Sequence, residues 1–413
     1  MISSMRLAAD LAQRVLLAGL FALTCTSISI PAASAETSAE PMAFYVATGA
    51  PDVCGPGCNR WIAVEGQIDA NAASRFRKFL QRTKDRNLPI YFASPGGNVD
   101  QAIAMGGMLR ERGAVARVGR TVVTECGFEA QDSGPCLRVK QSGAELHAAL
   151  WTRGAICVSA CPYLIFGATT REIAADAVVG VHSARVVVAF TGGTPTKEMR
   201  AAATERGRER IDRSLSSYLK RMGGETALLD LARTVRFEDM HVLTREEIAR
   251  FGIDRRDFVE TPWIFENAAR GVVYKTVSQR DGIDGPYRTT HWRLFCMDGD
   301  RFELDYQRQA AGNSALPTIS ISNAPSTSLY FRPPPAKRQG VEIWGLSLSK
   351  AAFRPFTETP QFDFTETSQS DGKRLARTMR LSSDGLAPAL ERLTATCAAP
   401  TQPRRGTENA LTQ

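Results

Sequence analysis

The alternation of short apolar runs with helical stretches between Pro41 and Val259 constrains the fold of this chain more than any other feature. Apolar runs typical of buried strands occupy residues 61–64, 88–93, 115–118, 156–158 and 178–181. The helical stretches between and after them occupy residues 69–82, with Asp69 as N-cap, 99–112, 160–166 and 197–221. Strand–helix–strand units of this length predict a parallel sheet covered by helices.

After about Thr261 the pattern becomes that of a smaller, β-rich part. Alternating residues at 292–296 and 302–306 flank Asp298-Gly299-Asp300 and predict a β-hairpin. The remaining features are strands at 319–321 and 344–348, a loop at Pro333-Pro334-Pro335 and a terminal helix at 386–397. No residues here indicate chemistry, so we expect a binding or packing role.

Length and composition bound the organisation of the chain. Its 413 residues suffice for two or three domains at about 150 residues each. We predict an α/β domain over residues 36–260, a β-rich domain over 261–400 and a flexible tail over 401–413. A content of 43% hydrophobic and 23% charged residues excludes wholesale disorder, collagen-like and coiled-coil folds.

The net charge of +8 is spread along the chain and identifies no partner, and we expect no nucleic-acid partner. The chain has only 4 histidines, which nearly excludes a multi-histidine metal site. We therefore expect neither a metal nor a cofactor.

The first 35 residues have the order of a secretory signal. Arg6 and Arg14 precede an apolar run at 15–23, and Ala33-Ser34-Ala35 follows as a cleavage motif. We expect cleavage after Ala35 and an exported protein, periplasmic or secreted. The alternative is an N-terminal membrane anchor, which is disfavoured because the apolar core is shorter than the ~20 residues that a bilayer needs.

The cysteines fit an oxidising compartment. Of nine cysteines, Cys25 lies in the segment expected to be removed, and the others are Cys54, Cys58, Cys126, Cys136, Cys157, Cys161, Cys296 and Cys397. An even number in an exported chain predicts disulfides, although eight cysteines allow 105 pairings. Neighbourhood along the chain suggests the pairs Cys54–Cys58, Cys126–Cys136, Cys157–Cys161 and Cys296–Cys397. The alternative is zinc at the two closely spaced pairs, which an oxidising compartment disfavours.

Ser94-Pro95-Gly96-Gly97 is the first of three segments that carry possible chemistry. It lies between the strand at 88–93 and the helix at 99–112. Two glycines at such a turn free the backbone to direct N–H groups into a cleft, which is the geometry that an oxyanion needs. The alternative is a tight turn that uses glycine only for its dihedral freedom.

Ser159 marks the second segment, because it stands where a buried strand becomes a helix. Its hydroxyl would lie at the positive end of the helix dipole, and the N–H of Ala160 would lie beside it as a second oxyanion donor. Cys157 and Cys161 flank it and would pin the turn. The alternative is an ordinary helix-capping serine.

His182 follows the strand at 178–181 and marks the third segment. A strand–helix–strand unit brings its two strand ends to the same sheet edge, so Ser159 and His182 can be neighbours in space. With few histidines available, His182 is the best general base for Ser159, whereas a structural histidine is the alternative.

The order of these segments resembles the Clp-type serine peptidases of the ClpP/crotonase superfamily, and most closely an exported branch of it. The residues that carry the resemblance are Ser94-Pro95-Gly96-Gly97, Ser159, Tyr163-Leu164-Ile165, Val181-His182 and the stretch 243–254, which ends Gly252-Ile253-Asp254. The resemblance covers about Trp61 to Asp254 and implies a spiral of ββα repeats. It also implies that Ser159 is the nucleophile, His182 the base, and the N–H groups of Gly97 and Ala160 the oxyanion donors.

The chain departs from the family at two places. Ala160-Cys161 replaces the Met-Gly that follows the family's nucleophile. Counting back from Gly252 places Met240 where the third triad residue belongs, so we predict that neighbouring Asp239 orients His182, with Glu238 as the alternative. If neither acid reaches the histidine, a Ser–His dyad or an inactive site remains.

The resemblance implies peptide-bond hydrolysis, with peptides or unfolded protein as substrates. An ATP-dependent unfoldase partner is not expected outside the cytoplasm. The helix at 197–221 occupies the region of subunit contacts in Clp peptidases, which makes a homo-oligomer plausible. Alternatives are a catalytically silent scaffold, a Ser–Lys peptidase and a crotonase-like acyl-CoA enzyme, the last disfavoured because its cofactor is cytoplasmic.

Thiol titration tests the disulfide prediction. We expect the denatured, unreduced mature protein to show no free thiols, because all eight remaining cysteines are predicted to be paired. Several free thiols would contradict the disulfide prediction and favour zinc.

Overall fold

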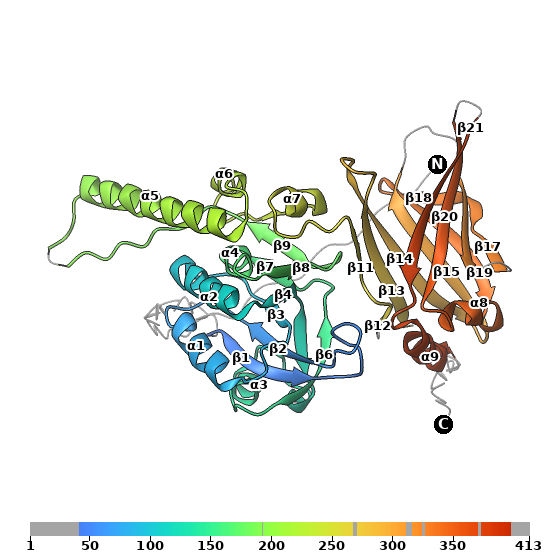
Figure 1. The fold of residues 1–413 in the computed structure, drawn as a ribbon, viewed down its shortest axis with the longest axis horizontal. Helices are drawn as coiled ribbons and strands as arrows, with labels where there is room; N and C mark the ends of the chain where they lie inside the picture. Colours follow the sequence, from blue (N-terminus) through green and yellow to red (C-terminus); the bar gives the residue numbers. More distant parts are fainter. Residues whose placement is uncertain are drawn as a thin grey trace, which may run out of the picture. The chain divides into compact units, whose positions relative to one another are not determined.

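The computed structural model describes residues 41–191, 193–266, 271–310, 316–323, 327–370 and 373–397. The predicted signal sequence and the predicted tail lie outside the described residues. Within them the chain forms a mixed α/β region up to residue 257, followed by a β-rich region from residue 258 (Figure 1). The two regions have separate hydrophobic cores.

A seven-stranded sheet in the order β5-β6-β1-β2-β3-β4-β8 is the base of the α/β region. Its strands are β1 (Ala43–Thr48), β2 (Arg60–Glu65), β3 (Ile90–Ala93), β4 (Val115–Val118), β5 (Arg120–Val123), β6 (Leu146–Trp151) and β8 (Thr170–Glu172). Strands β2, β3 and β4 are parallel neighbours, as predicted, and β8 extends this parallel set, whereas β1–β2 and β5–β6 are antiparallel. Strands β1, β5, β6 and β8 were not predicted from the sequence.

The continuous burial of β2 shows why its sequence reads as an apolar run. Ile62 and Val64 face the core that contains helices α1 and α2. Trp61 and Ala63 face a second core beneath the other side of the sheet. A strand that is buried on both faces does not alternate between polar and apolar residues.

The predicted helices are present in the predicted order, together with a helix at Gly134–Lys140 that was not predicted. They are α1 (Ala72–Arg82), α2 (Val99–Arg112), α3 (Gly134–Lys140), α4 (Cys161–Ile165), α5 (Lys197–Met222), α6 (Ala227–Thr234) and α7 (Arg245–Arg250), with a short 3₁₀ turn η1 (Thr124–Cys126). Asn98 caps α2 by accepting a hydrogen bond from the Gln101 N–H. The prediction that Asp69 caps α1 is wrong: Asn71 is the N-cap residue, and the Asp69 carboxylate instead binds Arg75.

A second, three-stranded sheet in the order β10-β9-β7 positions the candidate site. It contains β7 (Ile156–Val158), β9 (Val178–Val181) and β10 (His241–Val242). Ser94, at the end of β3, joins it to the large sheet: its N–H donates to Ile156 O at 2.8 Å, and its carbonyl accepts from the Val158 N–H at 3.1 Å.

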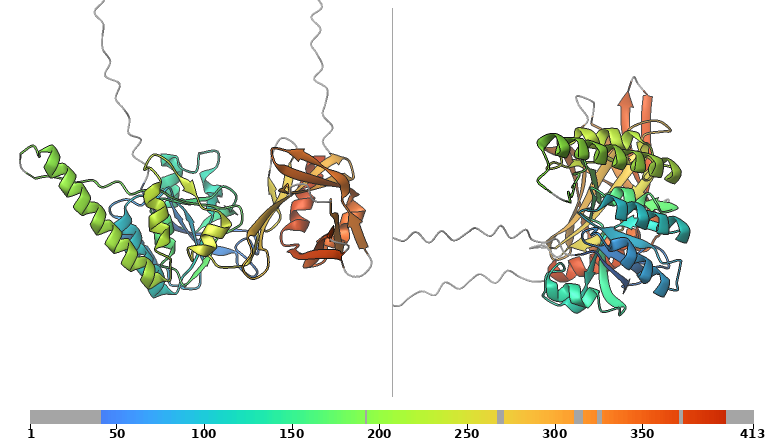
Figure 2. Two further views of the ribbon diagram at one scale, coloured as in Figure 1. Left: turned by 90° about the horizontal axis from the view of Figure 1, so that it is seen from above. Right: turned by 90° about the vertical axis from the view of Figure 1, so that its left-hand side faces the viewer.

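Helix α5 extends away from the other helices of the α/β region (Figure 2). Its buried residues are confined to the second half, at Leu215, Tyr218 and Leu219. The segment that precedes α5 packs against its first half, because a Cβ atom at Gly207 would come within 2.4 Å of Val186 Cγ1. Glycine at this position therefore allows the close approach.

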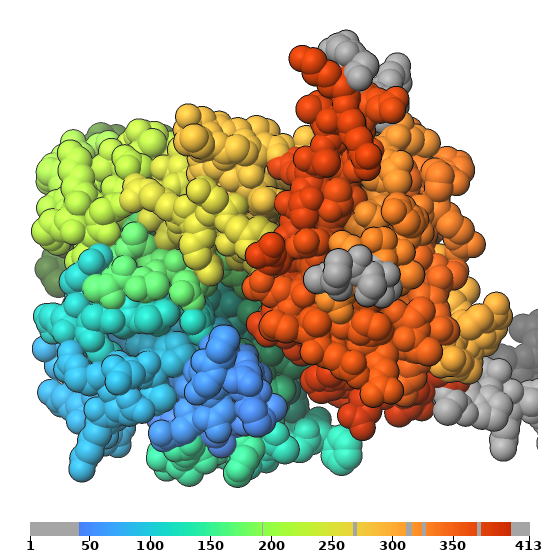
Figure 3. Space-filling model, turned by 45° about the vertical axis from the view of Figure 1, so that its right-hand side comes forward, coloured from blue at the N-terminus to red at the C-terminus, as the bar shows by residue number. Residues whose placement is uncertain are grey.

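The β-rich region contains two antiparallel sheets and two helices. The larger sheet contains β11 (Phe258–Glu260), β12 (Ile264–Glu266), β13 (Val272–Arg280), β14 (Tyr287–Asp298), β15 (Arg301–Gln309), β18 (Arg332–Arg338) and β19 (Val341–Ser349). The smaller contains β16 (Thr318–Asn323), β17 (Thr327–Tyr330), β20 (Gln361–Ser370) and β21 (Lys373–Ser382), and the helices are α8 (Lys350–Thr357) and α9 (Leu386–Cys397). The ends of β20 and β21 project beyond the rest of this region (Figure 3).

Two expectations for the β-rich region have different outcomes. The hairpin around Asp298-Gly299-Asp300 is present as β14–β15. The loop expected at Pro333-Pro334-Pro335 is wrong, because these residues lie in β18. Strand β18 is at the edge of its sheet and carries a register irregularity between Arg332 and Ala336. An irregular edge strand is where a sheet tolerates residues that lack an N–H.

Four disulfides link the eight described cysteines: Cys54–Cys58, Cys126–Cys136, Cys157–Cys161 and Cys296–Cys397. These are the pairs that neighbourhood along the chain suggested, and they are consistent with an oxidising location. Among the described residues, no helix has both the length and the apolarity needed to span a membrane.

Asp254 forms a buried ionic cluster near the C-terminal end of the α/β region. Its carboxylate contacts Arg245 at 3.1 Å and Arg256 at 2.6 Å, and accepts the Ile173 N–H at 2.8 Å. Burial raises its pKa, but hydrogen bonds and charge from the two arginines outweigh burial and lower the pKa from 3.8 to about 2.

Asp254→Asn is expected to lower the free energy of unfolding by about 3 kcal/mol at pH 7, because it leaves the buried Arg245 without a counter-charge. Since the folded-state pKa is depressed, the carboxylate's contribution to stability is complete above pH 3.8 and is lost as the pH falls through about 2. Denaturant unfolding measures both effects, with the exposed ion-pair variant Asp230→Asn as a control of unchanged stability. Equal stability of Asp254→Asn and wild type would contradict this account.

Candidate active site

The Ser94–Gly97 turn is held by hydrogen bonds to the chain around Gly66 and Ile68. The Ser94 hydroxyl donates to Gly66 O at 2.7 Å and accepts the Gly96 N–H at 3.1 Å. Gly96 and Gly97 have φ values of 94° and 136°. A Cβ atom at Gly97 would lie 2.3 Å from Ile68 O, so only glycine fits this backbone.

Ser159 has a left-handed backbone conformation, with φ of 61°. Asp52 and Gln339 are the other non-glycine residues with positive φ in the described part of the chain. The Ser159 N–H donates to Gly180 O at 2.9 Å, which ties the end of β7 to β9. A left-handed serine costs on the order of 1 kcal/mol, and such strain is typical of turns that present a reactive group.

The glycine turn lies directly against Ser159. A Cβ atom at Gly96 would come within 2.5 Å of the Ser159 Cβ and 2.8 Å of the Ala160 nitrogen. Neither the Gly97 N–H nor the Ala160 N–H donates a hydrogen bond to any residue that the structure describes. The turn therefore brings two unused donors to the vicinity of one hydroxyl, which is the requirement for an oxyanion hole.

His182 stands at the end of β9, beside the end of β7. The parallel register pairs Val158 with Gly180, so Ser159 and His182 follow neighbouring strand ends. No hydrogen bond joins the Ser159 hydroxyl to the His182 ring among the described residues. Burial, the largest cause, lowers the pKa of His182 from its usual value of 6.5, against the smaller opposing effects of the Ser183 backbone and of the charge of Glu238. The ring is therefore neutral at pH 7, the form that can accept a proton.

The structure does not bring the predicted acid to His182. Antiparallel pairing of His241 with Val181, continued by one residue, places Met240 opposite His182, as the count from Gly252 implied. The Asp239 carboxylate pairs with Arg236 at 3.1 Å, and Glu238 lies 4.0 Å from the same guanidinium. The His182 Nδ1 is buried and has no hydrogen-bond partner within the described ranges.

An aromatic ring contacts His182 where an acid was expected. The ring centroids of Phe237 and His182 lie 4.9 Å apart at 64°, and the Arg185 guanidinium lies 4.3 Å from the Phe237 centroid. Neither Phe237 nor Arg185 was predicted from the sequence. The only available indication was that Phe237 lies close to Asp239 in the chain.

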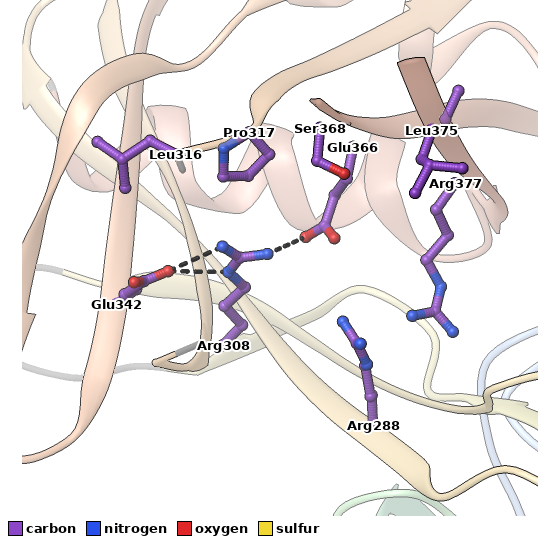
Figure 4. A pocket seen from close by; sticks show the side chains of 10 residues that line it. Arg288, Arg308, Leu316, Pro317, Glu342, Glu366, Ser368, Leu375 and Arg377 are labelled. Carbon is purple, nitrogen blue, oxygen red and sulfur yellow. Dashed lines mark hydrogen bonds and ion pairs between the residues drawn. The ribbon is translucent and has the colours of Figure 1, made fainter. Parts of the chain in front are cut away.

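A cavity of about 270 Å³ in the β-rich region offers a second place for a ligand (Figure 4). Three arginines line it, but each has a carboxylate partner. Arg308 contacts Glu342 at 2.9 Å and Glu366 at 3.1 Å, while Arg288 and Arg377 both contact Asp281. Each arginine that lines this cavity therefore already has a carboxylate within ion-pair distance. No group of three or more His, Cys, Asp or Glu side chains in the described ranges could hold a metal ion.

Comparisons with known proteins yield weak likenesses only. No family model matches, and no curated protein matches. Among solved structures, the invasion-associated protein B of Bartonella henselae is 9% identical, with a TM-score of 0.24 over 32% of this chain and 96% of that one. A membrane-bound stomatin-specific protease is 13% identical, with a TM-score of 0.27 over 46% of this chain and 75% of that one. A second structure of it, in complex with a substrate peptide, is 14% identical, with a TM-score of 0.27 over 46% of this chain and 71% of that one. Likenesses this weak do not assign an activity.

The free energy of unfolding of Ser159→Gly is expected to be about 1 kcal/mol higher than that of Ser159→Ala, because glycine adopts a positive φ without a Cβ penalty. Denaturant unfolding of the two variants measures the difference. The same pair of substitutions at Ser214, an exposed position in α5, serves as the control, where glycine should be the less stable by about 1 kcal/mol. Lower stability for Ser159→Gly than for Ser159→Ala would contradict the left-handed conformation.

Proposed function

We propose that this protein is an exported serine peptidase of the ClpP/crotonase type that hydrolyses peptide bonds through Ser159 and His182. The observation that carries the proposal is the left-handed Ser159 beside the unused N–H groups of Gly97 and Ala160. An ordinary helix-capping serine needs neither positive φ nor free donors around its hydroxyl.

The proposed reaction is acyl transfer to water. His182 accepts the Ser159 hydroxyl proton as the serine oxygen attacks the peptide carbonyl, and the Gly97 and Ala160 N–H groups stabilise the oxyanion. Breakage of the C–N bond sends the proton from His182 to the leaving amine. Water, deprotonated by His182, then attacks the acyl-enzyme, and His182 returns the proton to the Ser159 oxygen as the ester bond breaks and the acid product leaves. Loss of one oxyanion donor typically raises such a barrier by about 3 kcal/mol.

The base acts here without a carboxylate partner. Asp239 is paired with Arg236, so the proposal takes the form of a Ser–His dyad in which Asp239 acts at most through a rearrangement of that ion pair. The neutral imidazole that burial favours is the form a dyad requires. Substrates would be peptides or loose segments of unfolded protein, and self-association through α5 belongs to the same proposal.

A catalytically silent scaffold is the second candidate. The missing hydrogen bond between Ser159 and His182 and the unpartnered His182 Nδ1 favour it. In that case the β-rich region would supply the binding function.

A fluorophosphonate probe tests the proposal. We expect labelling of Ser159 in the folded protein, loss of labelling in Ser159→Ala and a strong reduction in His182→Ala. The labelling rate should rise with pH and level off above a midpoint below 6.5, because only neutral His182 accepts the proton and its pKa is depressed.

Ser183→Ala is the matched control, since this neighbouring serine lies outside the proposed chemistry and should leave labelling unchanged. Absence of labelling in folded wild-type protein would leave the scaffold as the better account.

A further inference from the structure

We infer that the Cys157–Cys161 disulfide is a positioning element that holds Ser159 in its left-handed conformation, an inference that rests on the proposed function. The bridge links the residues two positions before and two positions after Ser159. Both cysteines are completely buried. The covalent loop therefore encloses the strained residue.

The strand and the helix on either side of Ser159 are too short to hold its left-handed conformation by themselves. Strand β7 has 3 residues and helix α4 has 5. Before the serine, the chain is fastened by the Val158 N–H to Ser94 O and by the Ser159 N–H to Gly180 O. After it, the first helical hydrogen bond runs from the Leu164 N–H to Ala160 O and is long, at 3.3 Å.

An unfavourable backbone conformation persists only where several contacts with the surrounding structure restrain it. The hydrogen bonds secure the strand side of the turn, whereas the helix side begins with one long bond. A covalent link from Cys157 to Cys161 supplies the missing restraint, because it fixes the start of α4 relative to the end of β7. It also fixes the Ala160 N–H, which lies inside the same loop.

The chain contains a matched disulfide for comparison. Cys54–Cys58 has the same sequence separation of 4, so both bridges restrict the unfolded chain equally. It belongs to the other core of the α/β region and lies in a turn without proposed chemistry. A purely structural role predicts similar effects on Ser159 labelling from removing either bridge.

The experiment compares wild type with the variants Cys157→Ala/Cys161→Ala and Cys54→Ala/Cys58→Ala. Circular dichroism and thermal unfolding measure folding and stability, and fluorophosphonate labelling measures the reactivity of Ser159. NMR of the Ser159 backbone, through its H–N–Cα–H coupling combined with its H–N–Cα–Cβ coupling, reports the sign of φ independently of activity.

We expect both double variants to lose stability, with the larger loss in Cys157→Ala/Cys161→Ala because both of its cysteines are completely buried whereas Cys58 is half-buried. Labelling should fall roughly tenfold to a hundredfold only in Cys157→Ala/Cys161→Ala, the cost of a small displacement of a reacting group. The positive-φ signature of Ser159 should disappear in that variant alone. Wild-type labelling and an unchanged signature in it would overturn the inference.

The remaining outcomes also test whether the disulfide positions Ser159. If wild type is not labelled, the proposed peptidase fails, while the NMR comparison still tests the positioning role. If Cys157→Ala/Cys161→Ala does not fold, Cys157→Val/Cys161→Ala replaces the lost buried volume. Failure of both to fold while Cys54→Ala/Cys58→Ala folds would show a bridge needed for folding and overturn the inference.

Discussion

The α/β region depends on one backbone junction, the parallel bridge between Ser94 and Cys157. Ser94 binds two segments: its N–H and carbonyl bind β7 at Ile156 and Val158, and its hydroxyl binds the chain at Gly66. The large sheet and the three-stranded sheet are joined there. Because the glycine turn begins directly after Ser94, the hydrogen bonds that join the sheets also set the distance between the turn and the Ser159 hydroxyl.

Several groups with an unfavourable conformation or no hydrogen-bond partner lie around this junction. Ser159 has an unfavourable φ, two N–H groups lack acceptors in the described structure, and the buried Nδ1 of His182 lacks a partner. Folded proteins satisfy nearly all such groups, so several exceptions in one place argue for a functional site. The Phe237 ring packs against His182, and burial is the largest influence on the pKa of the imidazole.

The helices and strands with strong local patterns were predictable. Helix α2 has the predicted bounds because Asn98 caps its start and Gly113, in a left-handed conformation, ends it. Strand β1 was not predicted because two of its three buried residues are Ala43 and Ala47, and alanine has little preference for strands. The loop predicted at Pro333-Pro334-Pro335 was wrong because prolines fit in β18 only where this strand lies at the edge of its sheet. The local sequence does not indicate which strand will lie at an edge.

By itself, the sequence determined that Ser159 ends a strand, that His182 ends the next one in the same sheet, and that glycines precede helix α2, because local apolar spacing and turn residues encode these facts. The tertiary structure alone decided what surrounds each group. The register between β9 and β10 places methionine rather than an acid beside His182, and chain folding brings Phe237 to its ring. Neighbours across strands arise from packing over the whole region, so the site's electrostatics could be learned only from the folded chain.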